Sequence, residues 1–200
     1  MKIALINPYE LGRQPFGLAE PAAFLKRDGH TVSCCDLSIQ KLDDCLTADT
    51  GIVAIYIAMH TATRIAIEAL PKIKQLAPKA SLCVYGLYAP MNADLFRSLG
   101  VSTVIGGEFE YGLCDMAGRI QSGEGERQIE PETRLDKIQF IAPDRDTLPE
   151  LSRYAQLINT DGSTQTVGFS ETTRGCKYLC RHCPVVPVYQ GKFYVIPADI

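Results

Sequence analysis

Apolar residues in the first 122 positions of the chain follow two alternating periods. Short β-branched runs such as GIVAIYIA predict strands, and stretches with apolar residues at every third or fourth position predict helices. The predicted strands are residues 2–7, 31–37, 51–58, 82–86 and 101–105. The predicted helices are residues 17–28, 62–76, 93–99 and 111–120. Such regular alternation predicts helical crossovers between parallel strands.

The predicted strands suit a parallel sheet with helices on both faces. The run at 51–58 is apolar on both of its sides, as the central strands of parallel sheets are. We therefore predict an α/β fold with a flavodoxin-like or Rossmann-like sheet in the strand order 2-1-3-4-5. Ligands of such sheets bind at the carboxyl ends of the strands, where the candidate binding residues are Gly86, Gly107, Glu108 and His60. For His60, a histidine that touches no ligand is the alternative.

Residues 123–165 differ from the preceding part because polar and charged residues dominate them. We expect a surface-exposed connector there, with a short helix at 148–157. Arg145 within the connector suits a surface salt bridge. A bridge between domains and a contact with a cofactor phosphate are the alternatives for this residue.

Composition narrows the function only by exclusion. A chain of 200 residues with 46% hydrophobic content suits one full domain and part of another. The net charge of −3 gives no support for a nucleic acid or an anionic membrane as partner. No apolar run is long enough to span a bilayer, and the start MKIALINPYE has no signal-peptide pattern, so we expect a cytoplasmic protein. Five cysteines are expected to be small buried apolar side chains: Cys34, Cys35, Cys45, Cys83 and Cys114.

The other three cysteines lie within eight residues, in the run RGCKYLCRHCPV. Cys176, Cys180 and Cys183 have the spacing C-x3-C-x2-C, and thiolates favour iron–sulfur clusters, zinc or copper. A structural zinc site would need a fourth ligand, for which His182 is the nearby candidate. A disulfide would leave one thiol over, and chance clustering is the remaining alternative. Three thiolates suit a cubane cluster whose fourth iron stays open for chemistry.

The stretch TVGFSETT at 166–173 precedes this loop and has alternating apolar residues that predict a strand, which Arg174 and Gly175 end. A strand followed by this cysteine spacing resembles the radical SAM enzymes, whose cluster loop follows the first strand of a partial (β/α) barrel. The resemblance implies that the three cysteines hold a 4Fe-4S cluster and that S-adenosyl-L-methionine (SAM) binds its open iron. It also implies a reductant such as flavodoxin or ferredoxin and a 5′-deoxyadenosyl radical.

Residues beside the cysteines carry further expectations. His182 takes the place of an aromatic residue that lies near the adenine of SAM in the family, and a solvent-facing histidine is the alternative. Tyr178 and Leu179 are expected to pack around the cluster and to lower its exposure to solvent. Pro184 and Pro187 disfavour a helix directly after the loop.

The chain ahead of the cysteines resembles the cobalamin-binding domain of B12-dependent radical SAM enzymes. The points of likeness are INPYELGRQPFGLAEPAAFLKRDGHTV, the run VIGGEFE after the last predicted strand, and APDRDTLPELSRY in the connector. The resemblance covers nearly the whole chain and implies cobalamin-dependent methyl transfer to carbon. The chain departs from the pattern in two places, because no Asp-x-His-x-x-Gly motif occurs and Phe109 replaces a glycine of the usual Gly-Glu-Gly-Glu run.

Two alternatives to this function remain open. One is a cobalamin-free radical SAM enzyme. The other is a non-catalytic Rossmann-like module with a three-cysteine iron–sulfur or zinc site.

The predicted organisation has three parts: a cobalamin-binding-like domain at 1–122, a linker at 123–165, and the first strand and cluster loop of a radical SAM domain at 166–200. A complete barrel takes roughly 200 residues or more. We therefore expect an amino-terminal fragment or one part of a split protein, inactive alone, with apolar surface exposed. The substrate, a small molecule or a peptide, is not specified by these residues.

Overall fold

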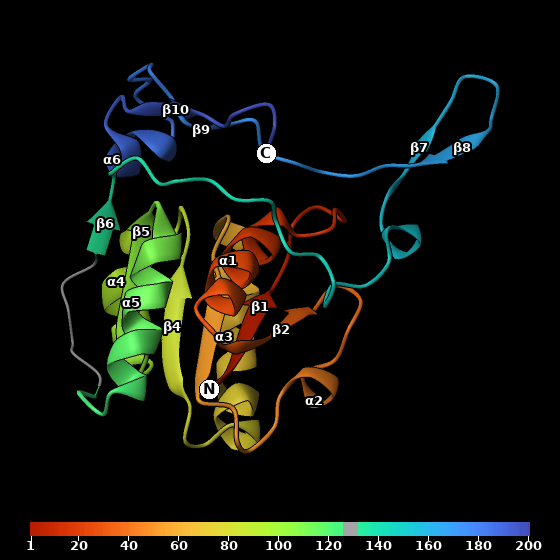
Figure 1. Cartoon of the computed structure of the whole chain (residues 1–200). Helices are drawn as coiled ribbons and strands as arrows, with labels where there is room; N and C mark the ends of the chain where they lie inside the picture. The colour runs from red at the N-terminus through yellow and green to blue at the C-terminus, as the bar shows by residue number, and fades with distance from the viewer. Residues whose placement is uncertain (126–131) are drawn as a thin grey trace.

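The five predicted strands all form and pair in the predicted order. In this computed structural model, which describes residues 1–125 and 132–200, they are β1 (Lys2–Asn7), β2 (Thr31–Asp36), β3 (Ile52–Tyr56), β4 (Ser81–Tyr85) and β5 (Thr103–Gly107). The strands are parallel and follow the order β2-β1-β3-β4-β5. The α/β class and the flavodoxin-like order are therefore confirmed, and the carboxyl ends of the strands lie along one edge (Figure 1).

A sixth strand, β6 (Glu132–Arg134), pairs in parallel with β5 and comes from the segment predicted to be an exposed connector. For these residues the prediction was wrong. The backbone N–H and C=O groups of β5 need partners on their outer side, and β6 supplies them. A short polar strand suits this position because it lies at the edge of the sheet, where its side chains are only partly buried.

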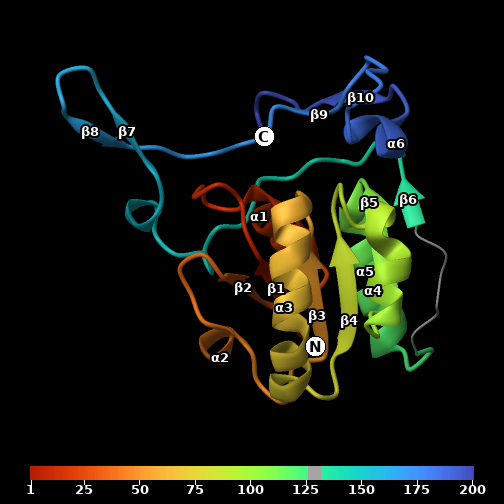
Figure 2. The same ribbon diagram turned by 180° about the vertical axis from the view of Figure 1, so that it is seen from behind.

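Helices cover both faces of the sheet, at the positions where the periodicity predicted them. On one face lie α1 (Phe16–Arg27) and α5 (Phe109–Gln121), and on the other lie α3 (His60–Leu76) and α4 (Ala93–Ser98) (Figures 1 and 2). Two unpredicted elements are the short helix α2 (Leu42–Cys45) and the 3-10 turn η1 (Pro90–Asn92). Both are too short to show a helical period in the sequence.

Side chains of the central strands alternate between the two helical layers. In β1, Ile3 and Leu5 join the core beneath α1 and α5, whereas Ala4 and Ile6 join the core beneath α3 and α4. Full burial of a leucine or isoleucine contributes about 1.5–3 kcal/mol. Strands buried on both faces must be apolar throughout, which is why these strands could be recognised in the sequence.

The chain after the sheet forms two small antiparallel units. The 3-10 turn η2 (Leu151–Arg153) leads into a hairpin of β7 (Gln156–Ile158) and β8 (Thr164–Thr166), which stands away from the sheet (Figure 1). Farther on, β9 (Thr173–Gly175) pairs with β10 (Phe193–Val195), and α6 (Val185–Tyr189) lies between them in the chain. The unit of β9, α6 and β10 lies over the carboxyl ends of β4 and β5 (Figures 1 and 2).

Several predictions for this last part were wrong. Among the described residues, 167–172 form no strand and 148–157 form no α-helix. Arg174 and Gly175 belong to β9 rather than ending a strand, because β10, much later in the chain, supplies their pairing partners.

The prolines after the loop do not prevent a helix. Pro187 falls in the first turn of α6, where a backbone N–H would have no partner within the helix. Pro184 directly precedes the helix, at its N-cap. Both rings therefore occupy positions that a helix tolerates.

The upstream cysteines follow the prediction in part. Cys35 and Cys45 form a disulfide between β2 and α2, which corrects the expectation of two separate thiols. Cys34 and Cys83 are buried and form no disulfide with the described cysteines, and Cys114 is half-buried. Within the described residues, no helix has the length and apolar character that a membrane span requires. Placement in the cytoplasm stays a prediction.

Candidate functional site at the carboxyl edge of the sheet

The loop that carries Cys176, Cys180 and Cys183 connects β9 to α6 above the parallel sheet (Figure 1). The backbone N–H of Cys176 donates to the carbonyl of Lys192 (3.1 Å), and that of Cys183 donates to the carbonyl of Cys180 (3.2 Å). All three cysteines are free thiols, with Cys180 exposed and the other two half-buried. The thiols are therefore accessible to an incoming metal.

The donor set fits an iron–sulfur cluster by its chemistry, because three unpaired thiols lie on one short loop. Their arrangement is not yet that of a metal site. Among residues 1–125 and 132–200, no three His, Cys, Asp or Glu side chains are gathered closely enough to hold a metal ion. The loop would have to tighten around a cluster as the cluster binds, as metal sites that form on binding do.

The other predicted residues near the loop are open to solvent. His182 is exposed, and so are Tyr178 and Leu179, which were expected to be packed. Their exposed fractions are 63% and 64%. His60 is the first residue of α3 and is also exposed. Contact of His182 with the adenine of SAM and contact of His60 with a ligand therefore stay predictions.

Gly86 and Gly107 allow close approaches at the ends of β4 and β5. Gly86 has φ of +104°, and a Cβ there would lie 2.8 Å from the ring of Tyr56. Gly107 has φ of +68°, and its Cβ would lie 2.1 Å from the carbonyl oxygen of Arg134. Glycine is the residue that takes both conformations without a clash. In this structure the two glycines approach protein atoms, and their predicted role in cofactor binding stays a prediction.

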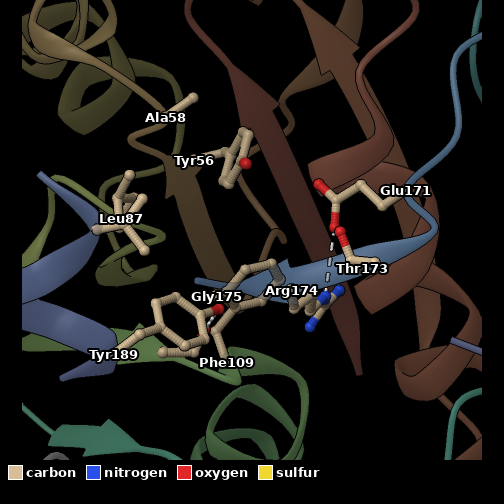
Figure 3. A pocket seen from close by; sticks show the side chains of 11 residues that line it. Tyr56, Ala58, Leu87, Phe109, Glu171, Thr173, Arg174, Gly175 and Tyr189 are labelled. Carbon is tan, nitrogen blue, oxygen red and sulfur yellow. Dashed lines mark hydrogen bonds and ion pairs between the residues drawn. The ribbon is translucent and has the colours of Figure 1, made fainter. Parts of the chain in front are cut away.

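A cavity of about 260 Å³ lies between the sheet edge and the unit of β9 and α6. Figure 3 shows the ring of Tyr56 on one side of it and those of Phe109 and Tyr189 on another, with Glu171 and Arg174 close by. The remaining lining residues are Ala58, Leu87, Gly107, Thr173, Gly175 and Val185. The volume falls just below the roughly 300–1,000 Å³ of pockets that enclose drug-sized ligands.

The guanidinium of Arg174 lies beside this cavity and is surrounded by carboxylates. It donates to Glu108 Oε2 (3.0 Å), Glu110 Oε1 (2.7 Å) and Glu171 Oε2 (3.3 Å), and it also pairs with Glu20. The side chain of Arg174 is 4% exposed, and those of Glu20, Glu108 and Glu110 are 2% exposed or less. We call Arg174 with these four glutamates the carboxylate cluster.

Aromatic rings cover the guanidinium as well. Arg174 lies over the ring of Phe109, 5.2 Å from its centroid, and over that of Phe140, 5.6 Å from its centroid. Phe109 is the residue that departs from the Gly-Glu-Gly-Glu pattern, and its ring also packs on Tyr56 and Tyr85. The ring therefore takes part in holding the cation of Arg174 next to the sheet.

The acidic groups of the carboxylate cluster outnumber the basic one, because four carboxyl groups surround a single guanidinium. Burial, followed by the charge of Glu110, raises the pKa of Glu20 to about 8. Burial also raises the pKa values of Glu108 and Glu171, although Arg174 opposes the shift in both cases. The raised pKa favours a proton on Glu20, which reduces the repulsion among the buried carboxyl groups.

Sequence reasoning missed this cluster, although one sign of it was present. Glu20 interrupts the apolar run FGLAEPAAFL of α1 and is buried there, where a charged residue needs a partner. The partner itself had no local sign, because Arg174 follows Glu20 by 154 positions. Of the predicted site residues, Glu108 alone belongs to the carboxylate cluster, and Gly107 precedes it in the chain.

Arg145 links two segments that are far apart in the sequence. It donates to Gln14 Oε1 and to the carbonyl oxygen of Phe169, at 2.7 Å in both cases. It thereby joins the β1–α1 connection to the segment that leads into β9, and among the described residues it forms no salt bridge.

Comparison with known proteins supports the fold. No family profile matches the sequence, and no curated protein matches it. Among solved structures, the chain is similar to the radical S-adenosylmethionine methyltransferase TsrM from Kitasatospora setae, with cobalamin and a 4Fe-4S cluster bound. The TM-score is 0.65 and the identity 19%, over 96% of this chain and 42% of that protein. The chain therefore shares the fold of less than half of that protein's length.

Proposed function

We propose that this chain is a radical SAM protein in which Cys176, Cys180 and Cys183 hold a 4Fe-4S cluster. One observation carries the proposal: three free thiols with the C-x3-C-x2-C spacing lie on one loop over the carboxyl edge of a flavodoxin-like sheet. The similarity in shape to TsrM supports the proposal, because that protein was solved with a 4Fe-4S cluster bound.

The bound cluster would supply one electron to SAM and so produce a 5′-deoxyadenosyl radical. The chain's own residues hold and surround the cofactors. The three thiolates ligate iron, and the ring of His182, beside Cys183, is free to lie against the adenine. The exposed side of the loop at Cys180 leaves room for a protein reductant of the flavodoxin or ferredoxin type.

Anaerobic reconstitution tests this proposal. The full chain is incubated with iron and sulfide, desalted, and assayed for iron, acid-labile sulfide and visible absorbance. Variants C176S, C180S and C183S should each lose the cluster absorbance, because each removes one of three thiolate ligands. Variant C114S is the matched control, since Cys114 is a free, half-buried thiol on α5, and it should load as the unmodified chain does.

The result that would contradict the proposal is equally specific. A chain that takes up one zinc ion and no iron under these conditions would be a zinc-binding module. Equal loading of C180S and the unmodified chain would remove Cys180 from the ligand set and leave too few thiolates for the proposed site.

Cobalamin use is a second candidate, favoured by the cobalamin bound in the solved TsrM structure. The cavity at the sheet edge does not fit a corrin as it stands. Its volume of about 260 Å³ lies just below the range of pockets that enclose drug-sized ligands, and a corrin is larger than such ligands. Tyr56, Phe109 and Arg174 fill the space beside it.

Titration with hydroxocobalamin separates the two candidates. Retention of corrin absorbance after desalting would support methyl transfer to carbon through cobalamin, and would require the unit of β9 and α6 to move away from the sheet. Cluster absorbance without retained corrin would favour a cobalamin-free radical SAM protein.

A further inference from the structure

Both ends of the cysteine loop are tied to a single carboxylate. Arg174 precedes the loop and donates from Nη1 to Glu108 Oε2 (3.0 Å). Tyr189, the last residue of α6, follows the loop and donates its hydroxyl to Glu108 Oε1 (3.0 Å). The two oxygens of Glu108 therefore each hold one end of the segment that contains all three thiols.

Glu108 is itself fixed by the parallel sheet. It directly follows β5, and its backbone N–H donates to the carbonyl of Arg134 in β6 (2.8 Å). The preceding Gly107 has φ of +68° and is packed against the same carbonyl. The side chain of Glu108 is 1% exposed, so its bonds are protected from competing water. Glu108 is thus a rigid point on the sheet rather than a mobile surface acid.

The loop between these two ties makes one backbone bond within itself and one to Lys192, which lies beyond α6. Cys176 bonds to Lys192, and Cys183 bonds to Cys180. Tyr178 and Leu179, at the middle of the loop, extend into solvent. The bonds at the two ends are therefore among the contacts that fix the three thiols relative to the sheet, together with the bonds of Lys192 and Tyr194 to the carbonyl of Leu135.

We propose that Glu108 is a positioning residue, which sets the place of the three cysteines over the sheet edge through Arg174 and Tyr189. The inference rests on the proposed function, because the position of the three cysteines matters for chemistry only if they hold a cluster. Small displacements of groups that support a metal site change its properties strongly, because such groups orient the ligands.

Arg174 has further partners, which make the tie at that end charge-assisted. It also pairs with Glu20 and Glu110, so loss of the Glu108 bond weakens this tie without removing every partner of the guanidinium. Tyr189 has two oxygen neighbours, Glu108 and the more distant carbonyl of Gly107 (3.4 Å). Glu108 is therefore the one partner that Arg174 and Tyr189 have in common among these bonds.

Hydrogen–deuterium exchange on the full chain without a cluster tests the positioning role directly. The variants are E108Q, which replaces one acceptor oxygen by an NH2 group, and Y189F, which removes only the hydroxyl. The matched control is E68Q, because Glu68 is exposed on α3. We expect peptides covering 174–192 to exchange at least about fivefold faster in E108Q, since a bond to a charged acceptor is among the stronger ones.

The variants distinguish loop release from unfolding. Exchange in β1, β3 and β4 should stay as in the unmodified chain, and E68Q should change neither region. Y189F should speed exchange at 174–192 less than E108Q does, because it breaks one bond and keeps the charge. The double variant should exceed E108Q only slightly, because both changes break the same bond. If E108Q fails to fold, Y189F alone decides.

A second readout concerns the cysteines themselves. After reconstitution with iron and sulfide, the electron paramagnetic resonance spectrum of the reduced protein should shift its g values in E108Q and keep them in E68Q. Unchanged exchange at 174–192 in both E108Q and Y189F would overturn the proposal. Faster exchange with an unchanged spectrum would also overturn it, because the bonds would then be merely structural.

Failure of the proposed function would look different. If the unmodified chain takes up no cluster, the radical SAM proposal fails, and the exchange measurement still decides whether Glu108 positions the loop.

Discussion

Arg174 lies among four carboxyl groups in a place that excludes water, and its charge controls how many of them can ionise. Removing one partner from a buried ion pair leaves an uncompensated charge, at a cost of roughly 3–5 kcal/mol. The carboxylate cluster joins α1, α5 and β9. Loss of one partner would therefore weaken the packing of the cysteine-bearing unit against the sheet.

The first prediction at this scale concerns Arg174 itself. R174M keeps an unbranched apolar stem and removes the charged guanidinium, so at about pH 8 it should lower the free energy of unfolding by roughly 3–5 kcal/mol. Urea denaturation measures the change. R64M is the control, because Arg64 is exposed on α3, and it should stay within about 0.5 kcal/mol of the unmodified chain. Equal small effects of both variants would show that the cluster is not held by Arg174.

The second prediction is a dependence of stability on pH. The pKa of Glu20 is about 8 in the folded chain and near its ordinary value of 4.5 when unfolded. Between these values the folded chain keeps a proton that the unfolded chain has released, so the free energy of unfolding falls as pH rises. The pKa of Glu20 is raised further by repulsion from the nearby carboxyl groups of Glu110, Glu108 and Glu171. The charge of Arg174 acts in the opposite direction. Glu10, whose pKa burial also raises to about 8, acts in the same direction.

Variant E20Q isolates this effect, because glutamine resembles the protonated acid and does not titrate. Urea denaturation between about pH 5 and about pH 8 should show a smaller fall in stability for E20Q than for the unmodified chain. Parallel curves for the two proteins would exclude a raised pKa at Glu20.

At the scale of single elements, the sequence was informative where contacts are local. The strands and helices before residue 122 follow from their periods, because each buries a fixed face or both faces. Of the elements after residue 131, β6 and β9 were missed because their partners are distant: β6 needs β5, and β9 needs β10. No local pattern in TVGFSETT or RGC could reveal those pairings.

The end of β5 offers a prediction at this scale. G107A places a Cβ 2.1 Å from the carbonyl oxygen of Arg134 at φ of +68°, so the turn and the pairing with β6 must shift. We expect a loss of roughly 1–3 kcal/mol in the free energy of unfolding. The control is G118A, at an exposed position inside α5 with open space around it, where alanine should add roughly 0.5–1 kcal/mol. Destabilisation by both substitutions alike would contradict the close approach at Gly107.

At the scale of the whole molecule, the unit bearing the cysteines lies on the carboxyl edge of the sheet, where ligands of such folds bind (Figures 1 and 3). The three thiols and the strand order were predictable from local spacing and periodicity. The contact between loop and sheet was not, because Glu20, Glu108 and Glu110 meet Arg174 across 154, 66 and 64 positions. Ion pairs over such separations leave no repeating pattern in a single sequence.

The central claim is that the thiols on this loop bind a 4Fe-4S cluster, and its most direct test is the iron and acid-labile sulfide content of the anaerobically reconstituted full chain. The account predicts about four iron and about four sulfide per chain, falling to near zero when Cys176, Cys180 and Cys183 are replaced together by serine. A reconstituted chain that retains no iron and sulfide, or the same content in that triple variant, would contradict it.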